Sequence, residues 1–166
     1  MNPDNVYRDS GKADRLLIDE FEIEFRIKLP KGYRELIQEH NALWPEKSLF
    51  RFHNRYHNEL WSYRLNQDGT DSRDVTFYGF GEHLPNYERM DWAQGFDVYG
   101  HDHIIAFGAA ANGDHICFDY RHDPSTNEPH VVVMFHDAYD EHNKMLICHV
   151  ANSFEAFMDS LYKSDD

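Results

Sequence analysis

The sequence predicts an α+β domain: an antiparallel sheet of about four to six strands, with two N-terminal helices and one C-terminal helix packed on it. Three observations predict this class. Two N-terminal segments repeat apolar residues at helical spacing, several β-rich segments follow between residues 104 and 150, and a last helical stripe closes the chain. Helices first, an antiparallel meander next and a helix last is an order typical of α+β domains.

The two N-terminal helices are predicted on either side of Leu29-Pro30. The first runs from about Asp14 to Phe25, with an apolar stripe formed by Leu17, Ile18, Phe21 and Phe25. Pro30 suits the first turn of a second helix, whose stripe is Tyr33, Leu36, Ile37 and His40. Residues 41–45 end this helix.

A β-hairpin is the strongest local prediction, over Ile104 to Asp119. Two apolar runs flank Asn112-Gly113, a pair that favours a two-residue type I′ turn because both positions need positive φ. Counting outward from this turn pairs Ala111 with Asp114 and Phe107 with Phe118, and one face becomes bulky and apolar. The opposite face carries small residues and one carboxylate, from Ala106, Gly108, Cys117 and Asp119, so we expect that something approaches this face closely.

The middle of the chain, residues 46–100, gives weaker patterns. Strands are predicted at Leu49 to Phe52, at Glu59 to Leu65 and at Asp74 to Gly81, with a turn at Gln67-Asp68-Gly69. The pattern leaves open whether this region is one hairpin plus a helix or several short strands.

The C-terminal part predicts two more strands and the closing helix. Val131 to Phe135 is apolar on both faces, which favours a central strand. An acidic loop from Asp137 to Lys144 leads to a strand at Met145 to Val150. Asn152 with Glu155 fits an N-terminal cap of a helix whose stripe is Phe154, Phe157, Met158, Leu161 and Tyr162.

Length and charge limit the class of protein. The 166 residues fit one domain, with residues 1–11 as a polar lead and residues 12–166 as the domain. Sixteen basic and 30 acidic residues give a net charge of −14. Such a surface repels nucleic acid and anionic membranes and attracts basic partners. The alternative is that the acidic charge only keeps the protein soluble.

The cysteines and the N-terminus favour a cytoplasmic protein. Cys117 and Cys148 lie in apolar strand-like runs without Cys-x-x-Cys spacing, as buried free thiols in a reducing compartment do. The N-terminus lacks the apolar region of a signal peptide, and no apolar run reaches the length of a membrane helix.

Patterns that would carry chemistry are weak. His101-x-His103 could put two imidazoles on one strand face for a metal, but solvated loop histidines are the alternative that the sequence favours. The acidic and histidine residues from His136 to His142 lack the spacing of a calcium loop. Asp119 could act as a lone acid, although a strand-end aspartate more often caps a turn. No nucleophile motif or phosphate loop is present, so we expect neither catalysis nor a cofactor.

Motifs along most of the chain resemble the SUKH superfamily. They are Leu29-Pro30-x-x-Tyr33 with Leu36 and Asn41, then Phe107-Gly108, Gly113-Asp114 and Ile116-Cys117-Phe118-Asp119, and then Val150-Ala151-Asn152-Ser153-Phe154-x-x-Phe157. The similarity covers residues 12 to 163 in the right order. The chain departs from the family after Asn41, where a glycine pair is usual and Ala42-Leu43 stand instead, and it matches poorly from Leu49 to Gly100.

This resemblance implies binding rather than catalysis. Many bacterial members resemble immunity proteins that neutralise a toxin, often a nuclease, whereas the fungal relatives are regulators of cell-wall assembly and glucan synthesis. The first implies a basic toxin domain as partner, and the second an endogenous protein bound by a regulatory scaffold. Affinity requires aromatic anchors beside acids, and the candidates are Tyr87, Glu88, Asp91, Trp92, Asp137, Tyr139, Asp140 and Glu141. For each aromatic residue, a place in the core is the alternative.

Overall fold

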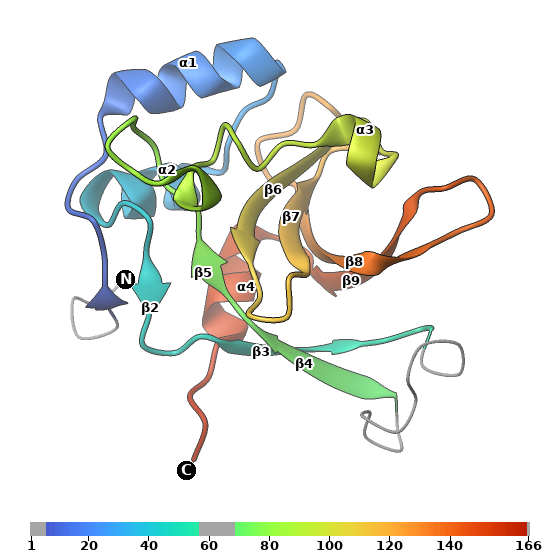
Figure 1. Ribbon diagram of the computed structural model, residues 1–166. Helices are drawn as coiled ribbons and strands as arrows, with labels where there is room; N and C mark the ends of the chain where they lie inside the picture. The colour runs from blue at the N-terminus through green and yellow to red at the C-terminus, as the bar shows by residue number, and fades with distance from the viewer. Residues whose placement is uncertain (1–5, 57–68, 166) are drawn as a thin grey trace.

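The computed structural model describes residues 6–56 and 69–165, and its centre is a five-stranded antiparallel sheet in the order β5-β6-β7-β8-β9 (Figure 1). Helices α1 and α2 precede the sheet along the chain, and α4 follows it, which confirms the predicted α+β class. Two short two-stranded sheets, β1-β2 and β3-β4, accompany the main sheet. None of the described helices has the length and apolarity needed to cross a bilayer.

Both N-terminal helices form where the apolar spacing predicts them. Helix α1 spans Arg15–Phe25, and the side chain of its N-cap, Asp14, accepts a hydrogen bond from Leu16 N at 2.9 Å. Helix α2 spans Lys31–Glu39, with Pro30 as the N-cap rather than inside the first turn. Its buried side chains are those of Tyr33, Leu36 and Ile37.

The β6–β7 hairpin exists, but its predicted two-residue turn is wrong. Strands β6, Ile104–Ala109, and β7, His115–Asp119, are joined by a turn in which Gly113 N donates to Ala110 O at 3.0 Å and Ala110 N donates to Asp114 O at 2.9 Å. Only Gly113 in this turn has positive φ, +97°. The three-residue turn needs one left-handed residue where the type I′ turn needs two, so a single glycine suffices.

The longer turn also changes the register of the hairpin. Ala109 pairs with His115, and after a bulge between Ala106 and Gly108 the partner of Phe118 is Ile105 rather than Phe107. The predicted division into faces is nevertheless confirmed, because Ile105, Phe107, Ile116 and Phe118 all lie in the main core, whereas Ala106 and Cys117 lie on the other side of the sheet. Phe107 and Phe118 still stack, with ring centroids 4.1 Å apart.

The main core is an aromatic cluster between the sheet and helices α2 and α4. Tyr33 of α2 packs edge-on against Phe118 and Phe154, with ring centroids 5.2 and 5.6 Å apart. Phe157 of α4 packs against Phe107 in the same way. Each buried phenylalanine stabilises the fold by about 1.5–3 kcal/mol through removal of apolar area from water, and edge-to-face pairs add about 0.5–1.5 kcal/mol.

The opposite face of the sheet carries a second, smaller apolar cluster. Tyr99 of the short helix α3, Phe96–Tyr99, packs there with Ile104, Ala106, Cys117, Val132, Met134, Met145 and Ile147. At the sheet edge, a Cβ atom on Gly108 would lie 2.7 Å from Thr76 O of β5. Glycine at this position therefore lets β5 approach β6.

In the middle of the chain, one long predicted strand is divided. Strand β3, Leu49–His53, is confirmed and pairs with β4, Thr70–Asp74. The strand predicted over Asp74 to Gly81 is wrong, because the chain leaves β4 at Asp74 and pairs with β6 only over β5, Thr76–Phe77. The strand predicted at Glu59 to Leu65 and most of the turn at Gln67-Asp68-Gly69 lie outside the described residues.

A buried asparagine organises the region between β5 and α3. Asn41, directly after α2, donates from Nδ2 to Phe80 O and accepts at Oδ1 from Phe80 N, both at 2.8 Å. The 3-10 helix Asn86–Glu88 follows in the same region. Within the predicted polar lead, β1, Val6–Arg8, pairs with β2, Trp44–Pro45.

The last strands and helix correct three predicted boundaries. Strand β8 spans His130–Tyr139, so Asp137 and Tyr139 belong to a strand and not to a loop. Strand β9 spans Met145–Ala151. Helix α4 spans Phe154–Ser160 and is capped by Ser153, whose Oγ accepts from Ala156 N at 3.1 Å, rather than by Asn152. Tyr162 lies beyond the helix and bridges to Leu49.

Candidate functional site

The eight predicted partner-binding residues lie in two groups. The first group, Tyr87, Glu88, Asp91 and Trp92, follows the path of the 3-10 helix and the residues after it. The second, Asp137, Tyr139, Asp140 and Glu141, lies at the end of the β8–β9 hairpin, which extends away from the body of the molecule (Figure 1). Within the described part of the chain, no hydrogen bond or ion pair joins the two groups.

The first group combines two exposed aromatic side chains with acids that are already paired. Tyr87 is 79% exposed and Trp92 is 61% exposed, so neither ring belongs to the core. Glu88 forms an ion pair with Arg8 at 3.7 Å, and Asp91 accepts two hydrogen bonds from Arg89. In this group, therefore, the aromatic rings are exposed, whereas the acids are engaged by arginines of the same chain.

The second group carries exposed acids. It lies within residues 137–144, which we name the β8–β9 arm. Glu141 pairs with His142 at 3.5 Å, which is its only ion pair among the described residues, and its side chain is 86% exposed. Asp137 is exposed, and Tyr139 is 44% exposed. Asp140 is different, because its Oδ1 accepts hydrogen bonds from His142 N and Lys144 N and closes the turn. These hydrogen bonds hold the pKa of Asp140 below its ordinary value.

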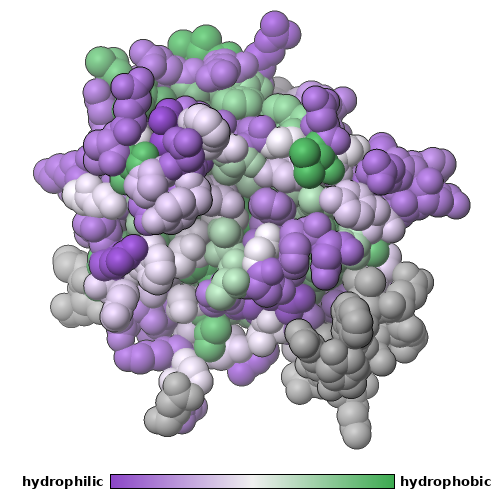
Figure 2. All heavy atoms as spheres, in the orientation of Figure 1, coloured by the Kyte–Doolittle hydropathy of each residue, from purple (hydrophilic) through white to green (hydrophobic). Residues whose placement is uncertain are grey.

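Hydrophobic residues form small separate patches on the surface. Figure 2 shows one face that is mostly hydrophilic, with isolated hydrophobic patches. Two exposed apolar side chains on α1, Leu16 and Ile23, are 65% and 77% exposed. Scattered single apolar residues of this kind are normal on a protein surface.

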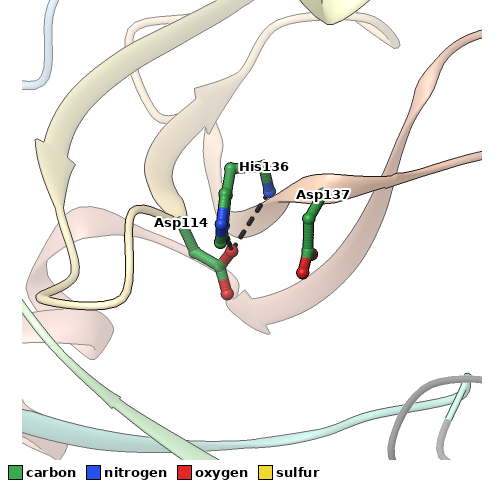
Figure 3. Close-up of side chains that lie close together, drawn as sticks. All are labelled: Asp114, His136 and Asp137. Carbon is green, nitrogen blue, oxygen red and sulfur yellow. Dashed lines mark hydrogen bonds and ion pairs between the residues drawn. The ribbon is translucent and has the colours of Figure 1, made fainter.

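A polar cluster that the sequence did not predict lies at the base of the arm (Figure 3). Its centre is the Asp114 carboxylate, whose side chain is 2% exposed. Oδ1 accepts from His136 Nδ1 at 2.6 Å and from His136 N at 3.1 Å, while Oδ2 accepts from Arg73 Nε at 2.9 Å and from Asn112 Nδ2 at 3.1 Å. The cluster thus joins β4, the β6–β7 turn and β8.

These contacts set the charge of Asp114. Burial alone would raise the pKa of its carboxyl group, but the hydrogen bonds from His136, Arg73 and Asn112 outweigh it and hold the pKa below the ordinary value. The neighbouring His115 differs, because its Nδ1 is buried without a hydrogen-bond partner in the part of the chain that the structure describes, and burial lowers its pKa. His115 packs against the ring of Tyr99 on the other side of the sheet.

The cluster also brings three possible metal ligands close together. Ligand atoms of Asp114, His136 and Asp137 lie within 4.8 Å of one another, a combination not found elsewhere in residues 6–56 and 69–165. However, the Asp114 oxygens already accept four hydrogen bonds, and one donor is a guanidinium at 2.9 Å that would repel a cation. The geometry therefore fits a structural cross-link better than a metal centre.

The remaining candidates for chemistry have structural partners. His101 Nε2 lies 2.8 Å from Met145 O, and His103 has a φ of 62° in an exposed turn. The carboxylate of Asp119 accepts hydrogen bonds from the backbone N–H of Arg121 and from its guanidinium, which confirms the turn-capping alternative. Both cysteines are free and buried, as predicted, and burial raises the pKa of each thiol. A thiolate nucleophile is therefore disfavoured at either position.

Comparison with protein families gives one result. Residues 12–160 match the SMI1 / KNR4 family (SUKH-1). The chain belongs to this family. Comparison of the SUKH-1 chain with curated proteins gives no match, and comparison with solved structures gives none either.

The departure after Asn41 has a visible backbone consequence. Ala42, which stands where the resemblance implies the start of a glycine pair, has a φ of 50°. This left-handed conformation costs a residue with a Cβ atom about 1–2 kcal/mol and costs glycine almost nothing. Ala42 thus holds a conformation that glycine would adopt at lower cost.

Proposed function

We propose that this SUKH-1 domain is a non-catalytic binding protein that neutralises a basic, nuclease-type toxin in the cytoplasm by stoichiometric binding. The observation that carries the proposal is the pairing of exposed aromatic rings with exposed acids on a chain of net charge −14. Family membership supports protein binding in general. The identity of the partner as a toxin rests on the charge and on the resemblance to immunity proteins.

Charge supplies the long-range part of the interaction. A nuclease needs a basic surface to hold phosphates, and an acidic protein competes for that surface. Opposite charges speed association by about 10- to 1000-fold at low salt, and the gain falls as salt increases. Within the arm, Asp137 and Glu141 are the acids best placed to act in this way, because they are exposed and are not used to close the turn.

Aromatic side chains supply the short-range part. Tyr87, Trp92 and Tyr139 are exposed, and aromatic residues of this kind are the side chains that most often dominate binding energy at interfaces. In this proposal, the acids determine how fast the complex forms, and the rings determine how long it lasts.

Co-expression with a nuclease toxin encoded beside this protein tests the proposal. We expect growth to be rescued by the wild-type protein and a one-to-one complex to form whose association slows as salt increases. Failure of rescue, or association that is indifferent to salt, would contradict neutralisation driven by charge. A salt-indifferent complex with an endogenous protein would instead support the regulatory scaffold.

Matched variants locate the contact. Asp137→Asn with Glu141→Gln removes two negative charges from the arm, while Glu20→Gln with Glu24→Gln removes the same charge from exposed positions on α1. We expect the arm variant to slow association at low salt by about fivefold and the α1 variant by less than about twofold. Equal effects would mean that only the overall charge matters. Trp92→Ala should instead increase the dissociation rate, by about tenfold.

A further inference from the structure

A cleft of about 390 Å³ is lined by residues of neither group described above, and Arg8 links it to the first group by contacting both Trp44 and Glu88. Its lining comes from β1, β2, the junction of β4 and β5 and the C-terminal segment, through residues that include Tyr7, Trp44, Glu46, Asp74 and Lys163. Pockets that hold small molecules or inserted side chains have volumes of about 300–1000 Å³. The cleft is therefore large enough to take a long side chain from another molecule.

Two aromatic side chains on the cleft are unusually open to solvent. Tyr7 is 69% exposed and Trp44 is 37% exposed, although both belong to short paired strands. The ring of Trp44 already carries a guanidinium, since Cζ of Arg8 lies 4.2 Å from the ring centroid. Indole and phenol faces attract cations, and arginine is the usual one.

The polar part of the cleft is acidic, and it already binds one cation. Glu46 forms an ion pair with the ammonium group of Lys163 from the C-terminal segment. The Asp74 carboxylate accepts one hydrogen bond, from Ala111 N to Oδ1 at 3.0 Å, and its other oxygen has no partner among the described residues. Among the residues that line the cleft, the two carboxylates exceed the single ammonium by one negative charge, and the nearby guanidinium of Arg8 is paired with Glu88, so the cleft favours a further or a competing cation.

We propose that this cleft binds an arginine side chain of the protein partner, with the guanidinium against the ring of Tyr7, beside Trp44, and hydrogen-bonded to Glu46 in place of Lys163. Arginine is favoured over lysine because a planar guanidinium both stacks on aromatic rings and bonds carboxylates in pairs. The inference rests on the proposed function, since it assigns to a basic partner a second point of contact. It concerns a surface that the arm and residues 87–92 do not include.

A small probe tests the cleft without the partner. N-acetyl-arginine methylamide is titrated into the ¹⁵N-labelled protein, with the citrulline analogue as a neutral control of the same shape. We expect saturable shifts at the Trp44 indole N–H and at the backbone of Ser48 and Thr76, which also line the cleft. Citrulline should give much smaller shifts, and the lysine analogue intermediate ones. Equal shifts with citrulline, or arginine shifts spread over the whole acidic surface, would overturn the proposal.

Charge variants separate this site from general attraction. Glu46→Gln should weaken arginine binding about threefold, and Lys163→Gln should strengthen it by a similar factor because the competing ammonium is gone. The matched controls are Glu39→Gln and Lys12→Gln, which change the net charge identically at an exposed ion pair elsewhere. If Lys163→Gln strengthened binding no more than Lys12→Gln does, the cleft would not be the site. Asp74→Asn keeps the acceptor for Ala111 N and tests the second carboxylate.

The two proposals fail in different ways. If the cleft binds the arginine probe but the protein neutralises no toxin, only the proposed function is wrong. If a toxin complex forms and its affinity is unchanged by Glu46→Gln and by Tyr7→Leu, the cleft does not take part and only the further inference is wrong.

Discussion

The β6–β7 and β8–β9 hairpins solve the same backbone problem in opposite surroundings. In both turns the fourth residue donates its N–H to the first carbonyl and the first donates to the fifth, as shown by Gly113 with Ala110 and by Asn143 with Asp140. Both place one residue at positive φ, +97° at Gly113 and 61° at Asn143. Yet the acid of the first turn, Asp114, is buried and fully hydrogen-bonded, while the second turn is exposed.

The difference teaches what decides the role of an acidic residue. The Asp114 oxygens accept hydrogen bonds from three parts of the fold, so this carboxylate cross-links β4, the β6–β7 turn and β8. Glu141 on the arm pairs, within residues 6–56 and 69–165, only with a neighbouring histidine, and its side chain remains exposed. Stability should therefore depend on the first hairpin, and association on the second.

The largest expected loss in the free energy of unfolding is at an aromatic residue of the β6–β7 hairpin. Phe118 is fully buried and stacks on Phe107. Phe118→Ala should lower the free energy of unfolding by about 4 kcal/mol, because the lost burial is joined by an unfilled cavity. The matched variant on the arm, Tyr139→Ala, should cost less than about 1 kcal/mol. Urea denaturation measures both, and similar losses would mean that the arm is part of the stable core.

The second largest loss in the free energy of unfolding is expected when the buried carboxylate of Asp114 is removed. Asp114→Ala leaves the guanidinium of Arg73 with Asp71 and the Ser72 carbonyl and deprives His136 of its acceptor, so we expect the free energy of unfolding to fall by about 3 kcal/mol. Glu141→Ala should change the free energy of unfolding by less than about 0.5 kcal/mol. A small loss for Asp114→Ala would show that the cluster is not the cross-link that its geometry indicates.

A smaller effect is expected at the positive-φ residues of the two turns. Gly113→Ala should destabilise the protein by about 1–2 kcal/mol, since a Cβ atom is strained at this φ and would meet the His136 ring at 3.4 Å. Asn143→Gly should change the free energy of unfolding by less than about 0.5 kcal/mol, because the arm turn tolerates either residue. Equal thermal shifts for the two variants would contradict the comparison.

The smallest expected effect is on the pH dependence of stability, to which Asp114 contributes. The pKa of Asp114 is lower in the folded protein than in the unfolded chain, so its contribution to stability is present above the unfolded value of about 3.9 and is lost as the pH falls through the folded value. The stability gap between the wild type and Asp114→Asn should therefore narrow as the pH is lowered from about 6 to about 2.5. A gap independent of pH would mean that Asp114 is not ionised in the folded state.

Local patterns predicted much of the fold correctly. The stripe that contains Ile18 and Phe21 predicted α1, and the alternation of bulky and small residues predicted which side of β6 and β7 enters the core. Both work because helical and strand periods are local properties of the chain. Asn112-Gly113 marked the position of a turn correctly but not its length, since one glycine is compatible with either turn.

Contacts between distant segments were beyond such patterns. The sequence around Asp114 does not predict its hydrogen bonds to Arg73, 41 residues earlier, and to His136, 22 residues later. The cleft likewise brings Tyr7, Trp44 and Lys163 together from both ends of the chain. The sequence also could not predict that Tyr87 and Trp92 are exposed. An aromatic residue next to acids has the same local sequence whether it lies at the edge of the core or on the surface.

The sequence by itself determined the class of fold, the family, the two faces of the central hairpin and a strongly acidic surface. Only the tertiary structure decided which acids are free to meet a partner and which are used within the protein. The physical reason is that a carboxylate has the same charge everywhere in a sequence, whereas its burial and its hydrogen-bond donors come from segments that meet only in the folded chain.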